Sequence, residues 1–136
     1  MATRIERTDL ARLLGAYWLP VGLYLALIFT LSSIPGLSVP GTFAYKDKIA
    51  HTLQYGGFGL LVHRAVKATW PQATRFRRGL LALIAIALFA VADEVFQAGT
   101  PGRDASIFDW SADVFGASLA QLLATAREKR GGGRPG

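Results

Sequence analysis

Cysteine is absent from this chain of 136 residues, histidine occurs only twice, and charged residues make up 18% of it. Without cysteine the chain has no disulfide, no thiol nucleophile and no zinc–thiolate site. Two histidines argue against a multi-histidine metal site, and no HExxH, DxD or histidine pair is present. The GxSxG, P-loop and GxGxxG motifs are also missing, so nucleotide chemistry has no support in the sequence. We therefore assign no metal site and no cofactor, and the sequence leaves open whether a metal binds.

The charged fraction lies below the roughly 25% of a soluble domain, because long apolar segments fill much of the chain. Residues 13–31 are 19 uncharged residues, enough to cross the hydrocarbon core of a bilayer. This run is too long for a signal peptide, and no A-x-A-like cleavage site follows it. Three further apolar helices are predicted at 47–64, 80–96 and 107–126. The sequence therefore predicts an all-α integral membrane protein, a four-transmembrane-helix bundle.

Polar segments divide the chain. We predict a cytoplasmic N-terminal segment at 1–12, a four-helix membrane domain at 13–126, and a disordered basic cytoplasmic tail at 127–136, where REKRGGGRPG is rich in glycine. Within the domain, residues 67–79 form a short basic connector. Pro20 either kinks the first helix or marks its true start.

The distribution of charge predicts how the helices are oriented. With four spans, twelve of the 15 Lys and Arg residues fall on the side of both termini, and Lys46, Lys48 and Arg103 fall on the other side. Lys and Arg concentrate on the cytoplasmic side of membrane proteins, so both termini should be cytoplasmic in a multi-pass protein of the bacterial inner membrane. Six of the nine acids lie on the outer side. The basic residues alternate with apolar runs, which argues against nucleic-acid binding.

The third predicted helix ends in acids directly after 13 uncharged residues. Asp93 and Gln97 share one helix face, and Glu94 points about 100° away from them. Charged groups at the edge of an apolar helix are costly unless they serve structure or function. Asp93 and Glu94 could act as a general acid or base, or as metal ligands, in a half-buried cavity. Alternatively, they form a helix end held by Arg103 or Lys48.

The fourth predicted helix begins with further acids. Asp109 suits the N-terminus of a helix, with Ser106 or Asp104 as the actual cap. Capping is the role that we expect for Asp104. Asp113 lies one turn deeper, where capping does not explain it, and we assign it to a polar site.

The loop before that helix contains Thr100-Pro101-Gly102-Arg103, a composition typical of a tight turn. Arg103 is the only basic residue in this loop. It could bind a phosphate or carboxylate of a ligand, because a guanidinium matches both groups. It could equally form an internal ion pair with Asp93, Glu94 or Asp109, and both interpretations stay open.

The second predicted helix opens with Asp47, Lys48 and His51. Asp47 and His51 are four residues apart and share a face with Tyr55. His51 could carry a proton or bind a metal ion beside a carboxylate. It could also bond an acid on a neighbouring helix, as polar residues between membrane helices commonly do. The glycines at 56, 57 and 59 would let another helix approach closely.

These motifs together resemble the VanZ-like membrane protein family. Its hallmarks are a D-K-x-x-H helix start, an acidic-x-x-Q helix end, a P-G-R turn and a D-x-x-x-[N/D]-x-x-G helix start. The matching positions are Asp47, Lys48 and His51; Glu94 and Gln97; Pro101, Gly102 and Arg103; and Asp109, Asp113 and Gly116. The resemblance covers about residues 13–125 and implies a small helical membrane protein. It implies no particular reaction or cofactor.

Our first hypothesis is an outward-facing polar site that binds or acts on a lipid-linked or phosphorylated envelope component. Arg103, Lys48, Gln97, Asp109, Asp113 and Asp47 would bind the ligand, and Glu94, Asp93 or His51 would transfer a proton. The sequence leaves open whether the protein is an enzyme. Membrane lipids and an anionic envelope ligand are the expected partners, and no protein partner is predicted. The alternatives are a non-enzymatic scaffold, whose acids and Arg103 form a structural salt-bridge network, and a small proton-coupled transporter.

Overall fold

The protein is all-helical over the part of the chain that its computed structural model describes, residues 9–38 and 45–131. The first helical run extends from Asp9 to Ser32 and contains a π-helical turn, η1 (Leu14–Trp18), followed by α2 (Leu19–Ser32). The other helices are α3 (Lys46–Thr69), α4 (Arg75–Ala98) and α5 (Ile107–Gly131). These segments coincide with the four predicted ones, and the prediction of an all-α chain is confirmed.

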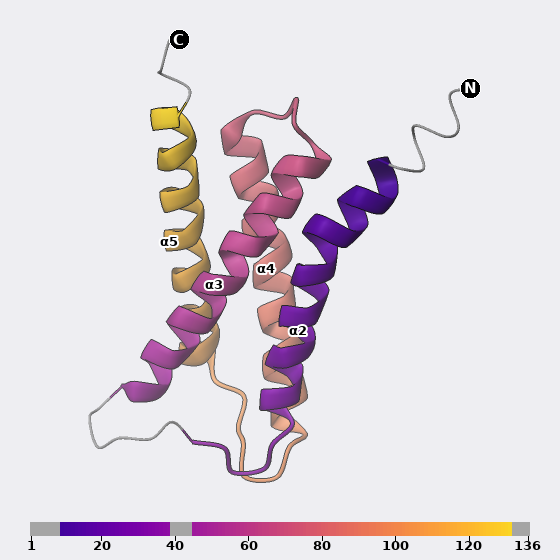
Figure 1. The fold of residues 1–136 in the computed structure, drawn as a ribbon. Helices are drawn as coiled ribbons and strands as arrows, with labels where there is room; N and C mark the ends of the chain where they lie inside the picture. The colour runs from indigo at the N-terminus through magenta and orange to yellow at the C-terminus, as the bar shows by residue number, and fades with distance from the viewer. Residues whose placement is uncertain (1–8, 39–44, 132–136) are drawn as a thin grey trace.

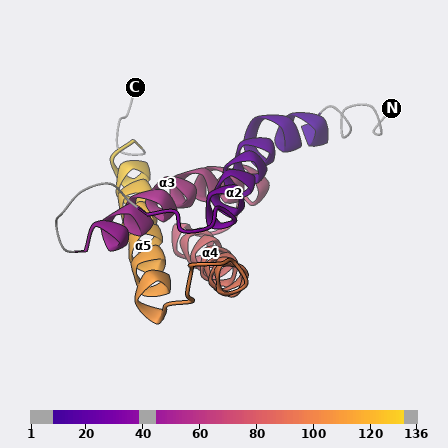
Figure 2. The same ribbon diagram turned by 90° about the horizontal axis from the view of Figure 1, so that it is seen from below.

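The helices run between two ends of the molecule (Figure 1). The N-terminal end of the first helical run and the C-terminal end of α5 lie at one end of the molecule, together with the α3–α4 connection. The α4–α5 loop and the residues that follow α2 lie at the other end. We call the latter the loop end. The most extensive contact is between α3 and α5, and α4 packs against both. Viewed from the loop end in Figure 2, α2 lies on the side of α3 and α4 away from α5.

Small residues allow α3 and α5 to pack closely. Gly116 of α5 lies against the backbone of Thr52 in α3, where a Cβ would overlap the Thr52 carbonyl oxygen. A Cβ on Gly59 would lie 2.9 Å from the Cβ of Ala120. The close approach that the glycines of the second helix predicted is therefore present, and it brings the polar residues of α3 and α5 together.

The connector between α3 and α4 is shorter than predicted. Residues 67–79 were expected to form it, but α3 continues to Thr69 and α4 begins at Arg75. Basic residues suit the C-terminal turn of α3, and the Thr74 side chain caps α4 by accepting a hydrogen bond from the Arg77 amide at 3.2 Å. Pro20 does not mark the start of the first helix, because the helical run of the described residues already includes Asp9. Pro20 instead lies in the first turn of α2, directly after η1.

The prediction of a disordered tail at 127–136 is wrong for its first residues, because α5 continues to Gly131; residues 132–136 lie outside the described part. Three basic side chains anchor Glu128: His63 at 2.9 Å, Arg78 at 2.7 Å and Lys67 at 3.3 Å. Burial alone would raise the pKa of the Glu128 carboxyl, but these hydrogen bonds outweigh burial and lower the pKa to about 2. This network extends the helix beyond the predicted end.

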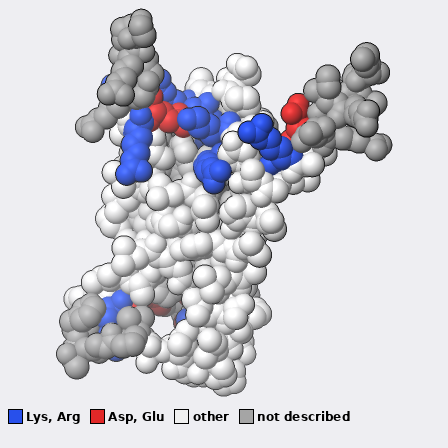
Figure 3. All heavy atoms as spheres, in the orientation of Figure 1, with Lys and Arg blue, Asp and Glu red and all other residues white. Residues whose placement is uncertain are grey.

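Two of the helical runs are long and apolar enough to cross a membrane, Asp9–Ser32 and Arg75–Ala98. Only 11% and 28% of their most apolar stretches are buried inside the molecule, so large side chains such as Leu23 and Leu88 remain exposed. Figure 3 shows the result on one face, where charged atoms lie at the two ends and a broad uncharged belt separates them. An apolar exterior of this kind is typical of contact with lipid.

Candidate functional site

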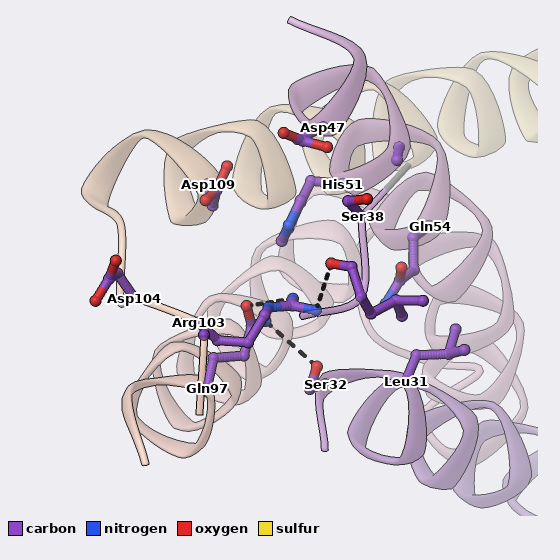
Figure 4. A pocket seen from close by; sticks show the side chains of 13 residues that line it. Leu31, Ser32, Ser38, Asp47, His51, Gln54, Gln97, Arg103, Asp104 and Asp109 are labelled. Carbon is purple, nitrogen blue, oxygen red and sulfur yellow. Dashed lines mark hydrogen bonds between the residues drawn. The ribbon is translucent and has the colours of Figure 1, made fainter. Parts of the chain in front are cut away.

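A cavity of about 440 Å³ opens at the loop end (Figure 4). It is formed by the end of α2 with the residues after it, the start of α3, the end of α4, the α4–α5 loop and the start of α5. Six of its lining residues are ones singled out by the sequence, namely Asp47, His51, Gln97, Arg103, Asp104 and Asp109. The sequence-predicted convergence of separate segments at one end is therefore observed for these residues.

Arg103 lies in the wall of this cavity without an acidic partner. Its guanidinium donates one hydrogen bond to Gln97 Oε1 at 2.6 Å and one to the Leu37 carbonyl oxygen at 3.3 Å (Figure 4). No carboxylate oxygen of the described residues lies within 4.0 Å of it. The predicted ion pair with Asp93, Glu94 or Asp109 is therefore wrong within residues 9–38 and 45–131. The half-buried side chain keeps its positive charge facing the cavity.

The turn that carries Arg103 packs against the segment after α2. Gly102 has a φ of 75°, a conformation that side chains other than glycine rarely adopt. A Cβ at Gly102 would also lie 3.4 Å from the Gly36 backbone nitrogen. Glycine at position 102 therefore allows both the turn and the close approach that sets the position of Arg103.

The other basic residue predicted for the site is already paired. Lys48 forms an ion pair with Asp109, joining the first turns of α3 and α5. Asp47 and Asp104 are exposed at the cavity margin. Lys48 is therefore less available than Arg103 for a ligand, because an anion would have to compete with the Asp109 carboxylate.

His51 bonds an acid across the α3–α5 interface, as one of the three predictions for it stated. Its Nδ1 lies 2.8 Å from Oδ1 of Asp113, which is fully buried. The second oxygen of Asp113, Oδ2, is buried without a hydrogen-bond partner among the described residues. His51 lines the cavity while Asp113 lies behind it. The two residues therefore connect the cavity to the helix interface.

Asp93 lies deeper than the sequence indicated. It is fully buried, and its Oδ2 accepts hydrogen bonds from Tyr55 Oη and Gln97 Nε2, both at 3.2 Å. Gln97 Nε2 also contacts Ser32 Oγ at 3.3 Å. Gln97 thus links Arg103 to Asp93, since its other amide atom accepts from the guanidinium. Asp93 does not line the cavity, so it positions Gln97 and Tyr55 rather than facing a ligand there.

Glu94 holds the start of α5. Its Oε2 accepts a hydrogen bond from the Ser106 amide at 2.6 Å, and its Oε1 is buried without a partner among the described residues. Ser106 is the residue that caps α5, because its Oγ accepts from the Asp109 amide at 3.3 Å. The capping role expected for Asp104 is not observed. Glu94 also borders a second, mainly apolar cavity of about 340 Å³ that includes Trp110.

Sequence reasoning missed two residues of this network. The sequence contained a signal for Tyr55, because this residue lies four positions after His51 on the same helix face. In the structure, its hydroxyl reaches Asp93 on α4. Ser32 had no such signal, because its contact with Gln97 joins residues 65 positions apart in the chain.

Three residues from three helices also come together as potential metal ligands. One ligand atom from each of His51, Glu94 and Asp113 lies within 4.8 Å of the other two. No sequence spacing could reveal this group, because its members come from α3, α4 and α5. The sequence offered His51 and Glu94 separately as possible metal ligands, and it left open whether a metal binds.

The fold and the cavity define a class of protein: an all-helical chain with membrane-length apolar helices and a buried polar cluster where its loops meet. The VanZ/LLP1 family model matches residues 22–127, and the chain belongs to this family. The resemblance carried by the D-K-x-x-H, P-G-R and related motifs is thereby confirmed. No curated protein and no solved structure matches the chain.

Proposed function

We propose that this VanZ-like protein crosses the bacterial inner membrane four times, with both termini in the cytoplasm. Three observations support this topology. The helices run between the same two ends of the molecule, the exterior between those ends is uncharged on the face in Figure 3, and twelve of the 15 basic residues fall on the side of the termini. The loop end then faces the cell envelope.

We further propose that the cavity at the loop end binds the anionic headgroup of a lipid-linked or phosphorylated envelope component. The observation that carries this proposal is Arg103, whose guanidinium lines the cavity and has no carboxylate partner among the described residues. Gln97 and the Leu37 carbonyl hold the guanidinium in place while leaving its charge uncompensated. A guanidinium so positioned binds phosphate or carboxylate through two parallel hydrogen bonds.

The cavity suits a headgroup that carries both anionic and neutral or cationic groups. Asp47 and Asp104 at its margin would accept hydrogen bonds from hydroxyl or ammonium groups while Arg103 binds the anion. His51 is the lining residue best suited to move a proton, because Asp113 orients its ring. Glu94 and Asp93 do not line this cavity, so any role of theirs in proton transfer would pass through neighbouring groups.

The test is lipid binding to the purified protein in detergent, read by native mass spectrometry. Phosphatidylglycerol and undecaprenyl phosphate are the anionic probes, and phosphatidylcholine is the comparison without net charge. We expect Arg103→Gln to weaken binding of the anionic lipids about tenfold or more, since a hydrogen bond to a charged group contributes roughly 1.5–3 kcal/mol.

Arg77→Gln is the matched control, because Arg77 is exposed at the opposite end of the molecule. Equal lipid binding by the two variants would contradict the proposal. A folded Arg77→Gln beside an unfolded Arg103→Gln would instead favour the scaffold, in which the polar cluster holds the helices together. Thermal unfolding of both variants distinguishes these outcomes.

A further inference from the structure

The buried acids at the loop end have few positive partners. Asp93 and Asp113 are fully buried and Glu94 is 6% exposed. Within the described residues, no Lys or Arg nitrogen lies within 4.0 Å of their carboxylate oxygens, and His51 is the sole basic side chain that contacts any of them. Several buried carboxylates without cations are costly, because each loses its hydration without gaining a compensating charge.

All three of these acids also have an unpartnered oxygen in the protein interior. Asp93 Oδ1, Glu94 Oε1 and Asp113 Oδ2 are buried and have no hydrogen-bond partner among the described residues. Buried polar atoms are nearly always paired, so each such atom calls for an explanation. Two of these acids, Glu94 and Asp113, form a group with His51 in which one ligand atom of each residue lies within 4.8 Å of the other two.

The geometry is close to that of a metal centre. Ligand atoms bound to one ion at about 2.0–2.2 Å lie at most about 4.4 Å apart, so small side-chain rotations would bring the three residues into coordination. Their helices are fixed against each other by the glycine contacts between α3 and α5 and by the Glu94 bond to the Ser106 amide. His51 lines the cavity, so a coordination position would remain open on that side.

We infer that His51, Glu94 and Asp113 form a binding site for a first-row divalent transition metal ion such as Zn²⁺ or Mn²⁺. One imidazole nitrogen and two carboxylates favour these ions over Mg²⁺ and Ca²⁺, which prefer ligands that are all oxygen. The ion would bind the Glu94 and Asp113 carboxylates, each of which has an unpartnered oxygen, and would offset the buried negative charge. This inference takes up the metal-ligand interpretation of His51 and Glu94 that the sequence left open, and it does not depend on the anion proposed above.

The experiment titrates Zn²⁺, Mn²⁺ and Mg²⁺ into the full-length protein in detergent, after removal of the affinity tag and treatment with EDTA. Isothermal titration calorimetry should show one Zn²⁺ or Mn²⁺ per chain and at least tenfold weaker binding of Mg²⁺. Glu94→Gln and Asp113→Asn should each weaken Zn²⁺ binding more than about 100-fold, since even residues that only support a ligand change affinity 10–100-fold. Asp9→Asn, which removes an exposed acid at the opposite end of the molecule, should leave affinity unchanged.

Failure to bind Zn²⁺ or Mn²⁺ at one ion per chain would overturn the inference, as would equal affinity in Glu94→Gln and Asp9→Asn. Pulsed EPR of Mn²⁺ on the wild-type protein needs no folded variant, because an imidazole nitrogen bound to the ion gives a hyperfine coupling. A bound Mn²⁺ without that coupling would also overturn it. No lipid is present in these assays, so their outcome is separate from that of the Arg103 test.

Discussion

Buried carboxylates dominate the loop end at the scale of single residues. Each one is stabilised by donors from a different helix: Asp93 by Tyr55, Asp113 by His51, and Glu94 by the Ser106 amide. Because these donors come from α3 and from the residue directly before α5, the acids connect the helices behind the cavity. Removing one donor should therefore lower the free energy of unfolding more directly than it changes the binding of any ligand.

The bond from Tyr55 to Asp93 gives the clearest test of this view. Tyr55→Phe keeps the ring but removes a donor to a fully buried carboxylate, so we expect a loss of about 1–3 kcal/mol in the free energy of unfolding. Tyr45→Phe makes the same chemical change at a side chain that is 78% exposed, and it should change little. Thermal unfolding in detergent measures both variants, and equal melting temperatures would show that the bond is unimportant.

Glu128 predicts a pH dependence at the opposite end. Its pKa in the folded protein, about 2, lies below its ordinary value of 4.5, so the folded state binds a proton there less readily than the unfolded state. Its contribution to stability is complete above pH 4.5 and is lost as the pH falls toward about 2. The melting temperature of Glu128→Gln should be lower than that of the wild type at neutral pH, and the two should converge across this window. Parallel curves would contradict the prediction.

Close packing of α3 and α5 is the decisive feature at the scale of elements. Gly116→Ala places a methyl group against the Thr52 carbonyl oxygen, and the backbone has to move because neither group can rotate away. We expect the variant to be destabilised by more than about 1 kcal/mol and to lose the His51–Asp113 contact, which lies within the same interface.

Gly22→Ala is the matched control in α2, where a Cβ would meet nothing within 4 Å. Alanine favours a helix over glycine by about 1 kcal/mol, so this variant should be as stable as the wild type or more so. Urea or thermal unfolding compares the two changes, and similar destabilisation by both would argue against close packing as the cause.

The membrane topology can be tested at the scale of the whole molecule. The natural chain has no cysteine, so single cysteines can be introduced without other changes. We expect Ala105→Cys, in the α4–α5 loop, to react with a membrane-impermeant maleimide in intact spheroplasts, and Gln72→Cys, between α3 and α4, to react only after permeabilisation. Both side chains are exposed. The reverse pattern would overturn the proposed orientation, and labelling of both in intact spheroplasts would overturn the four-span topology.

The sequence by itself determined the four helical segments and which polar residues lie near helix ends, because apolar runs and hydrogen-bond satisfaction in a membrane are local requirements. It also carried the family motifs. Helix boundaries were less accurate: Glu128 extends α5 through contacts with α3 and α4 that no local pattern contains.

Only the tertiary structure decided the partners within the site. The pairing of Arg103 with Gln97 and Leu37, and of Lys48 with Asp109, depends on how the helices cross. Side chains four residues apart on one helix can be placed by periodicity, but contacts between helices depend on packing at glycines such as Gly116. For that reason the sequence indicated that acids gather at one end of the molecule. Only the structure showed that Arg103 faces the cavity without an acidic partner among the described residues.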